Sequence, residues 1–323
     1  MNKITQSQAI GFFLILLPIL SDTSHAEPPL RIVGSSAVFP FAATVAEHFS
    51  YKTHEPIPLI EAVGTGAGIK LFCGSLKGPD GVIASRPLTT REKEKCKENG
   101  ISFEEFTIGQ DGLVFIQNKQ AQFFSLTLQD LDFALSEKIQ QGKECHSNPY
   151  KTWNHIQSIF PSLPIRVLGP APTSGTYDIL VEKIIKSCGP FIRHDGAYIE
   201  APANENLVVQ KVLNTPDTIG IVTFSFYDQN RAHLQALPIN SVPPSFDSIQ
   251  DKTYPLSRPL YFYVKINELK LHPARHAYTL EFTSDEAIGE KGYLNEKGLI
   301  PLSAQEQKVM HDQASRLQTG EKS

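Results

Sequence analysis

The chain lacks the patterns that identify several large classes of protein. Its 323 residues include four cysteines, and their spacing matches no zinc-binding pattern. No glycine run leads into the lysine of a nucleotide-binding P-loop, and the G-x-S-x-G pattern of many hydrolases is missing. A net charge of −4 argues against non-specific binding to nucleic acid, so we expect no nucleic-acid partner.

Long hydrophobic runs are also scarce. The strongest is IGFFLILLPIL at residues 10–20, and an 11-residue helix would span roughly 16 Å, about half of a bilayer core. Lys3 precedes this run, and Ser24-His25-Ala26 follows it with small residues at the −3 and −1 positions of a cleavage site. The pattern predicts a secretory signal peptide over residues 1–26, cleaved near Ala26, with an uncleaved membrane anchor as the alternative.

The predicted export of the chain bears on whether its four cysteines form disulfides. An even number of cysteines in an exported chain favours disulfides over free thiols, although four buried thiols are the alternative. Three connectivities are possible. We expect Cys73–Cys96 and Cys145–Cys188, because pairing in sequence order closes the shortest loops.

The same local pattern occurs three times along the chain. A short apolar run leads into a loop of glycine, serine or threonine, and apolar side chains then recur at helical spacing. The runs are 30–33, 58–63 and 164–168, and the loops are 34–36, 64–68 and 169–176. The second helix is expected to carry Ile69, Phe72, Cys73 and Leu76 on one face. Alternation of this kind predicts an α/β fold with a largely parallel sheet.

These loops are candidate anion-binding sites. The start of a helix leaves four N–H groups unpaired and carries a partial positive charge, and Ser or Thr adds hydroxyl donors. A plain N-cap is the alternative for each loop alone. Three such loops in one chain could converge on one tetrahedral anion. The loop GTGAG at 64–68 is not a dinucleotide fingerprint, because Ile69 stands where the last glycine is required.

Several segments taken together carry a family resemblance. GSSAVFPF, GTGAGIKLFC, ASRPL and GPAPTSGT, in this order, resemble the periplasmic phosphate-binding proteins of the Pst-type ABC transporter family. The segments IGQDGLVF, NPYKTW, NENLVVQ, YPLSRPLYFYVK and KGLIPL agree with it, so the resemblance covers nearly the whole mature chain. It implies a two-lobe, type II periplasmic binding protein fold with two hinge strands, located in the periplasm. The hinges would cross near 107–111 and 254–261, which makes 27–107 plus 261–323 lobe I and 108–260 lobe II.

The resemblance also implies a set of ligand-binding residues. Phe39 matches a residue that donates its backbone N–H, and Thr65 matches a serine ligand. Val38 stands where the family often has threonine, and Ser36 could replace the missing hydroxyl. Ser174, Gly175 and Thr176 match the Ser-Gly-Thr motif fully. The implied neutral donors are Ser36, Ala37, Val38, Phe39, Thr65, Gly66, Ser174, Gly175 and Thr176.

Two departures from the family affect the charged ligands. The family's Asp is replaced by Ser85-Arg86, and its Arg corresponds to Pro170. Arg86 could restore the cation, with a surface ion pair as the alternative, and Ser85 could still donate or accept. Phosphate keeps a P–OH donor at neutral pH, so it needs an acceptor. Asp111 is our candidate, with an Asp-Gly turn as its alternative, and Glu61 and Asp178 are weaker ones.

The sequence therefore predicts a binding protein without catalytic activity and without a cofactor. We expect a monomer that captures inorganic phosphate between two lobes and delivers it to inner-membrane ABC permease subunits. A binding protein for another oxyanion, such as sulfate or molybdate, is the first alternative, because the missing Asp leaves mainly donors. A secreted phosphatase is the second, although the sequence shows no nucleophile with a base and no metal cluster.

Overall fold

The computed structural model describes residues 28–172, 174–201, 204–267, 269 and 272–317. The predicted signal peptide, and with it the cleavage near Ala26, lies outside these residues. Within the described ranges, no helix is both long and apolar enough to cross a membrane.

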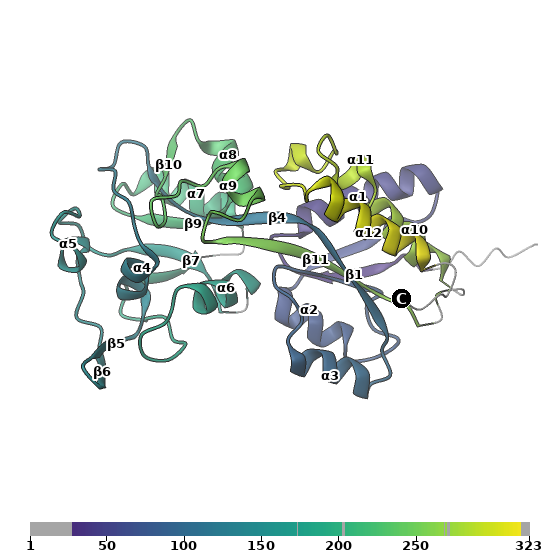
Figure 1. Ribbon diagram of the computed structural model, residues 1–323, viewed down its shortest axis with the longest axis horizontal. Coiled ribbons are helices and arrows are strands. Elements are labelled where there is room, and N and C mark those ends of the chain that lie inside the picture. Colours follow the sequence, from purple (N-terminus) through teal and green to yellow (C-terminus); the bar gives the residue numbers. More distant parts are fainter. Residues whose placement is uncertain (1–27, 173, 202–203, 268, 270–271, 318–323) are drawn as a thin grey trace, which may run out of the picture.

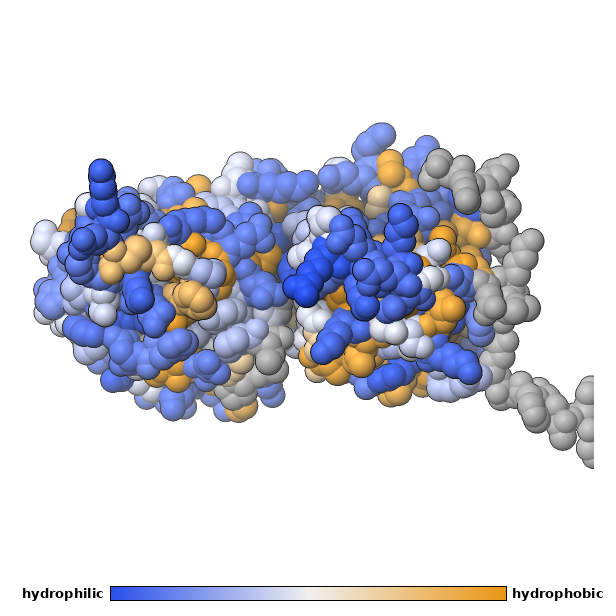
Figure 2. Space-filling view, turned by 90° about the horizontal axis from the view of Figure 1, so that it is seen from below, coloured by the Kyte–Doolittle hydropathy of each residue, from blue (hydrophilic) through white to orange (hydrophobic). Residues whose placement is uncertain are grey.

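The molecule consists of two lobes joined by two long strands (Figure 1). The strands are β4 (Phe103–Asn118) and β11 (Ser257–Lys265), which pair in antiparallel fashion and run from one lobe into the other. The sheet order is β2-β1-β3-β11-β4-β9-β7-β8, with β10 beside β4. Figure 2 shows the two lobes from below, with a furrow between them.

Lobe I is built on three parallel strands, with β11 antiparallel beside β3. The strands are β1 (Arg31–Gly34), β2 (Leu59–Ala62) and β3 (Gly81–Ala84). The helices are α1 (Phe39–Thr53), α2 (Thr65–Phe72), α3 (Thr90–Glu98), α10 (Pro273–Phe282), α11 (Asp285–Ile288) and α12 (Ala304–Arg316), with the 3₁₀ helix η2 (Asn295–Lys297). Alternating side chains of the strands bury against α2 and α3 on one face and against α1 and α10 on the other.

Lobe II is built in the same way around β7 (Val167–Pro170), which is parallel to β8 (Tyr198–Ala201) and β9 (Ile219–Thr223). β10 (Leu234–Ala236) pairs with the end of β4, and β5 (Lys138–Gln141) forms a hairpin with β6 (Glu144–Ser147). The helices are α4 (Leu128–Leu135), α5 (Trp153–Ile156), α6 (Gly175–Lys183), α7 (Glu205–Asn214), α8 (Phe224–Asn230) and α9 (Phe246–Gln250).

The hydrophobic core divides as the two lobes do. One cluster of buried residues draws on 113–256 together with Ile300. The other two draw on residues between 30 and 108 and between 260 and 314. Strand β4 changes partners at this division, because residues up to Gly112 pair with β11 whereas Leu113 to Ile116 pair with β9.

Two sequence predictions can be compared with these elements directly. The disulfides are Cys73–Cys96 and Cys145–Cys188, which confirms the predicted pairing. The second amphipathic helix is shorter than predicted, because α2 ends at Phe72 and Leu76 lies beyond it with 49% of its surface exposed. Cys73 is the cap residue, and the N–H of Gly74, which follows it, donates to the carbonyl of Leu71 at 3.3 Å, so the last turn is tightened.

Candidate functional site

The loops that follow β1, β2 and β3 lie in contact at one edge of lobe I. Gly64 donates its N–H to the carbonyl of Gly34 at 2.8 Å, and Ser35 donates to the carbonyl of Ile83 at 2.9 Å. A Cβ added to Gly68 would lie only 2.6 Å from the Cα of Gly34, so this approach requires glycine. The parallel register of the strands therefore brings three segments that are distant in sequence to one place.

The start of α2 presents neutral donors at this edge. Thr65 is the first helical residue, and the preceding Gly64, at φ 87°, offers no side chain to cap the helix. The hydroxyls of Thr65 and Ser85 lie 3.1 Å apart, and the N–H of Ser85 donates to Thr65 Oγ1 at 3.3 Å. Both side chains are buried. Because the amides of the first turn have no intrahelical acceptor, Gly66 and its neighbours leave N–H groups available to an anion.

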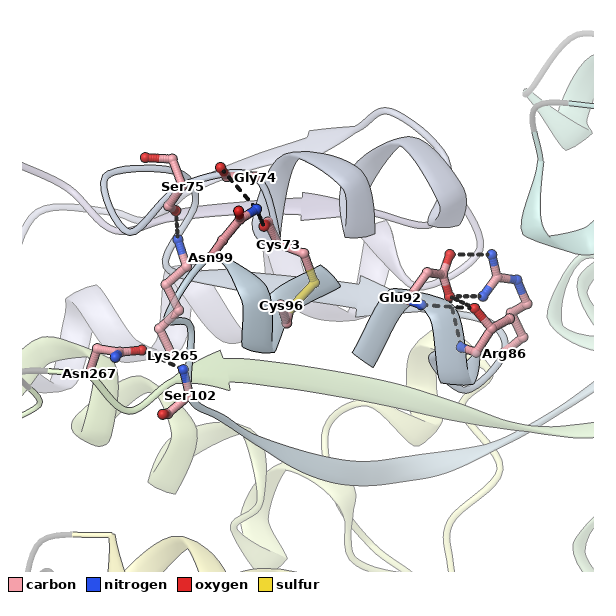
Figure 3. The surroundings of a disulfide bond; sticks show 11 residues. Cys73, Gly74, Ser75, Arg86, Glu92, Cys96, Asn99, Ser102, Lys265 and Asn267 are labelled. Atoms are coloured by element: carbon pink, nitrogen blue, oxygen red, sulfur yellow. Dashed lines mark hydrogen bonds and ion pairs between the residues drawn. A yellow bond between two sulfur atoms is a disulfide. The ribbon is translucent and has the colours of Figure 1, made fainter. Parts of the chain in front are cut away.

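The other end of α2 is fixed by several interactions (Figure 3). The Cys73–Cys96 disulfide ties it to α3, and Asn99 Nδ2 donates to the carbonyl of Cys73 at 2.6 Å. Lys265 is buried, and its Nζ donates to the carbonyls of Ser75 at 2.6 Å and Leu76 at 3.3 Å. Burial lowers the pKa of Lys265 to about 8. A cation at the carboxyl end complements the helix dipole, whose positive end then points to the loop edge.

The first predicted loop, which connects β1 to α1, forms hydrogen bonds within itself. The N–H of Phe39 donates to the carbonyl of Ser35 at 3.0 Å, so in this conformation it does not face an anion as we expected. Val38 is fully buried in the lobe I core and precedes the first residue of α1. Ser36 and Ala37 are half-buried and lie in the turn between β1 and α1. Phe39 is 36% exposed, so of the four predicted residues only Val38 is buried.

The Ser-Gly-Thr motif of lobe II starts α6, as predicted. Ser174 is the N-cap, and its Oγ accepts the N–H of Thr176 at 3.1 Å. Gly175 is the first helical residue, and Thr176 is buried. Strand β7 ends at Pro170 and leads into this loop, of which Thr173 lies outside the described residues. Ser174 therefore caps the same helix start that is predicted to bind an anion.

Arg86 connects the two lobes but is not a free cation. Its Nε donates to Asp178 Oδ2 at 3.0 Å, across from lobe I to the first turn of α6. Its Nη1 and Nη2 bond to the Glu92 carboxylate at 2.9 and 3.0 Å (Figure 3). Burial alone would raise the pKa of Glu92, yet Arg86 and the capping bonds hold it below its ordinary value. The ion pair that we considered as the alternative is thus what the structure contains.

Asp111 also has a different role from the one expected. It lies inside β4, directly opposite Arg258 of β11, and not in a turn. Its Oδ2 accepts from Arg258 Nε at 3.1 Å and Nη2 at 2.8 Å. Its Oδ1 accepts the N–H groups of Gly112 at 2.8 Å and Phe224 at 3.4 Å. Since a carboxylate offers about four acceptor positions, Asp111 has none to spare for a P–OH group.

Arg258 is the functional candidate that sequence reasoning missed. Only 1% of its surface is exposed, and its Nη1 donates to Thr176 Oγ1 at 3.2 Å. It therefore joins a hinge strand to the Ser-Gly-Thr motif of lobe II. The available signal was its place in the segment YPLSRPLYFYVK, which also carried the predicted crossing between the lobes.

Glu205, from the segment NENLVVQ, is a second residue that was not singled out. Its Oε2 accepts from the N–H of Thr223 at 2.7 Å and from the Thr223 hydroxyl at 3.0 Å. Glu205 begins α7 after β8, whereas Thr223 ends β9, and β7 lies between these strands. The side chain therefore passes the end of β7. Burial raises the pKa of Glu205 to about 7, and the nearby Asp111 adds to this effect.

Comparison with known proteins places the chain in a family. A model of the PBP superfamily domain matches residues 21–286. Protein SphX of Synechococcus elongatus is 32% identical over 316 residues, which cover 93% of this chain and 88% of that protein. The phosphate-binding protein PstS of Staphylococcus saprophyticus is 31% identical over 255 residues, 77% of this chain and 74% of PstS. The chain belongs to the Pst-type phosphate-binding proteins.

A solved structure agrees with this assignment. The crystal structure of a possible phosphate binding protein from Planctomyces limnophilus matches with a TM-score of 0.67 at 27% identity, over 90% of this chain and 98% of that one. The two-lobe fold predicted from the sequence is thus confirmed. Pst-type proteins are extracytoplasmic substrate-binding components of phosphate ABC transporters and are not enzymes.

Proposed function

We propose that this chain captures inorganic phosphate between its lobes and delivers it to inner-membrane ABC permease subunits. The observation that carries the proposal is the approach of the two lobes at their helix starts. Arg86 of lobe I, in the loop next to the start of α2, bonds to Asp178 in the first turn of α6 at 3.0 Å. An anion between these helices would be within reach of donors from both lobes.

The proposed ligand residues are neutral donors from both sides. Lobe I supplies the turn at Ser36 and Ala37, the start of α2, and the hydroxyl of Ser85. Lobe II supplies the start of α6. The full set is Ser36, Ala37, Thr65, Gly66, Ser85, Ser174, Gly175 and Thr176. Because the ligand bonds to both lobes, it stabilises the closed arrangement selectively.

We also propose the lobe boundaries that the sequence suggested. We propose lobe I as 27–107 plus 261–323 and lobe II as 108–260, which agrees with the separation of the buried clusters except at Ile108, Leu260 and Ile300. The hinges would then lie within β4 and β11. We also propose that the mature protein works in the periplasm as a monomer after cleavage near Ala26.

Calorimetry tests the function directly. The chain from residue 27 onward would be unfolded, stripped of phosphate, refolded and titrated with phosphate, arsenate and sulfate. We expect one site that prefers phosphate and that excess sulfate does not occupy. Replacing Thr65 by Val should weaken phosphate binding, whereas the same change at buried Thr279 of α10 should not. An absence of phosphate binding would contradict the proposal.

A sulfate-type ligand is the second candidate, because Asp111 is fully engaged by Arg258 and by two N–H groups. A site with donors only would favour an anion that carries no proton. Tighter binding of sulfate than of phosphate in the same titration would establish this alternative.

A further inference from the structure

A phosphate site built only from neutral donors lacks a compensating positive charge. Arg86, the cation expected from the sequence, is shared between two carboxylates, Glu92 and Asp178. Its Nη1 also bonds to the carbonyl of Pro87 at 3.1 Å. The group of three side chains therefore carries a net negative charge, and it cannot supply what an oxyanion needs.

Arg258 is placed differently. Among the residues that the structure describes, its one carboxylate partner is Asp111, whose Oδ2 accepts from two of its nitrogens. The third nitrogen, Nη1, points to Thr176 Oγ1. Because that hydroxyl oxygen accepts from a guanidinium, its own proton is directed elsewhere and is polarised by a positive charge.

Because the Thr176 hydroxyl accepts from Arg258, its proton can be donated to an anion, and Arg258 then contributes to phosphate recognition. We propose that Arg258 is the residue that brings positive charge to the phosphate site, acting through the Thr176 hydroxyl, with Asp111 fixing its orientation. This inference rests on the proposed function. In this role Arg258 is a positioning residue, since Thr176 makes the contact with the anion. Arg258, on hinge strand β11, would then supply the positive charge that the family's arginine supplies at the position occupied here by Pro170.

The place of the pair in the hinge strengthens the argument. Asp111 and Arg258 face each other in register on β4 and β11, the two strands that join the lobes. Phe224, at the start of α8, also donates its N–H to Asp111. The guanidinium is thus held from several elements, and its orientation does not depend on one flexible loop. Such preorganisation is what strengthens a hydrogen bond to an anion in a dry site.

A double-mutant cycle tests the coupling. Phosphate affinity would be measured for the wild type, Arg258→Lys, Thr176→Val and the double variant, together with the unfolding midpoint of each without phosphate. Lysine keeps a charge beside Asp111 but cannot serve Asp111 and Thr176 in the same fork. We expect each single variant to weaken binding by about 10-fold or more, and the double variant to bind hardly more weakly than Thr176→Val alone. Unchanged affinity of Arg258→Lys, or fully additive effects, would overturn the proposal.

Arg193 offers a matched control in the same lobe. Only 2% of it is exposed, and it pairs with Asp195 through Nε at 2.8 Å and Nη2 at 2.5 Å. Its Nη1 bonds to the carbonyls of Ala134 and Tyr150. Arg193→Lys should lower the unfolding midpoint and leave phosphate affinity unchanged. Equal losses of affinity in both lysine variants would show a general effect of stability and would refute the role of Arg258.

A second variant covers the case that Arg258→Lys does not fold. Replacing the pair together, as Arg258→Met with Asp111→Leu, leaves no unpaired charge in the interior. The folded double variant should bind phosphate more weakly by about 10-fold or more. If this variant binds phosphate as tightly as the wild type, the role of Arg258 is overturned and the proposed function stands. If the wild type itself binds no phosphate, the proposed function is overturned as well.

Discussion

The two halves of the proposed site are built on different principles. In lobe I, the buried hydroxyls of Thr65 and Ser85 pair with each other, and the nearby cation Arg86 is held by two carboxylates. In lobe II, the Thr176 hydroxyl is backed by Arg258, which has one carboxylate partner on the neighbouring hinge strand. The comparison indicates that lobe I supplies neutral donors and lobe II, with the hinge, supplies charge. Recognition and closure would then be separable by mutation.

The largest expected effect concerns the disulfides, one in each lobe. Replacing both cysteines of either bridge by alanine should lower the free energy of unfolding by about 3–4 kcal/mol, as for loops of 23 and 43 residues. Only loss of Cys73–Cys96 should also weaken phosphate binding, because it anchors the helix that starts at Thr65. Denaturant unfolding and calorimetry measure the two effects. If removing the Cys145–Cys188 disulfide weakened phosphate binding equally, the two disulfides would not differ in their effect on the site.

The hydroxyl pair of lobe I gives the next effect. Thr65→Val removes the acceptor of the Ser85 N–H and leaves that buried group unpaired. We expect a loss of about 1–3 kcal/mol in unfolding free energy and weaker phosphate binding. Denaturant midpoints without ligand and titrations with phosphate provide both numbers, with Thr279→Val as the control. Phosphate affinity equal to that of the wild type would exclude Thr65 as a ligand.

Glu205 of lobe II should make the stability of the protein depend on pH. The pKa of Glu205 is raised from 4.5 to about 7 in the folded protein, chiefly by burial. Between these values the unfolded chain loses the proton while the folded chain keeps it, so stability falls as pH rises and levels off above about 7. Unfolding of the wild type and Glu205→Gln at pH 4, 6 and 8 tests this. The stability of the wild type relative to the variant should decline across the series, and a constant difference would contradict it.

The smallest expected effect is that of the ion pair between the lobes. The Asp178 side chain is 42% exposed, so Asp178→Asn should cost no more than about 0.5–1 kcal/mol of closure. This corresponds to phosphate dissociation that is faster by about 2- to 5-fold, which stopped-flow measurements can resolve. Asp228→Asn, which removes the surface pair between Asp228 of α8 and the cap residue Arg231, is the matched control. Equal rates in both variants would show that the Arg86–Asp178 bond does not hold the closed state.

Much of this architecture could be predicted from the sequence because it depends on local patterns. The strand, loop and helix repeats placed the starts of α1, α2 and α6, and the cysteine order gave both disulfides. The predicted end of α2 was wrong because the apolar spacing continues to Leu76 although the helix ends at Phe72. Periodicity describes a buried face, and it does not locate a terminus.

The charged contacts could not be predicted, since they depend on long-range pairing. Asp111 and Arg258 are 147 residues apart, and they meet only because β4 and β11 pair in this register. Arg86 and Asp178 are 92 residues apart and lie in different lobes. No single-sequence pattern distinguishes these arginines from one another. Only the fold decides that Arg86 meets two carboxylates, whereas Arg258 meets Asp111 and the Thr176 hydroxyl.

A crystal structure of the mature protein with phosphate tests most directly whether the anion binds between the lobes. We expect one phosphate there, within hydrogen-bond distance of Thr65 on one side and Thr176 on the other, with Arg258 still bonded to Thr176. A phosphate that contacts a single lobe, or that binds away from the starts of α2 and α6, would contradict it.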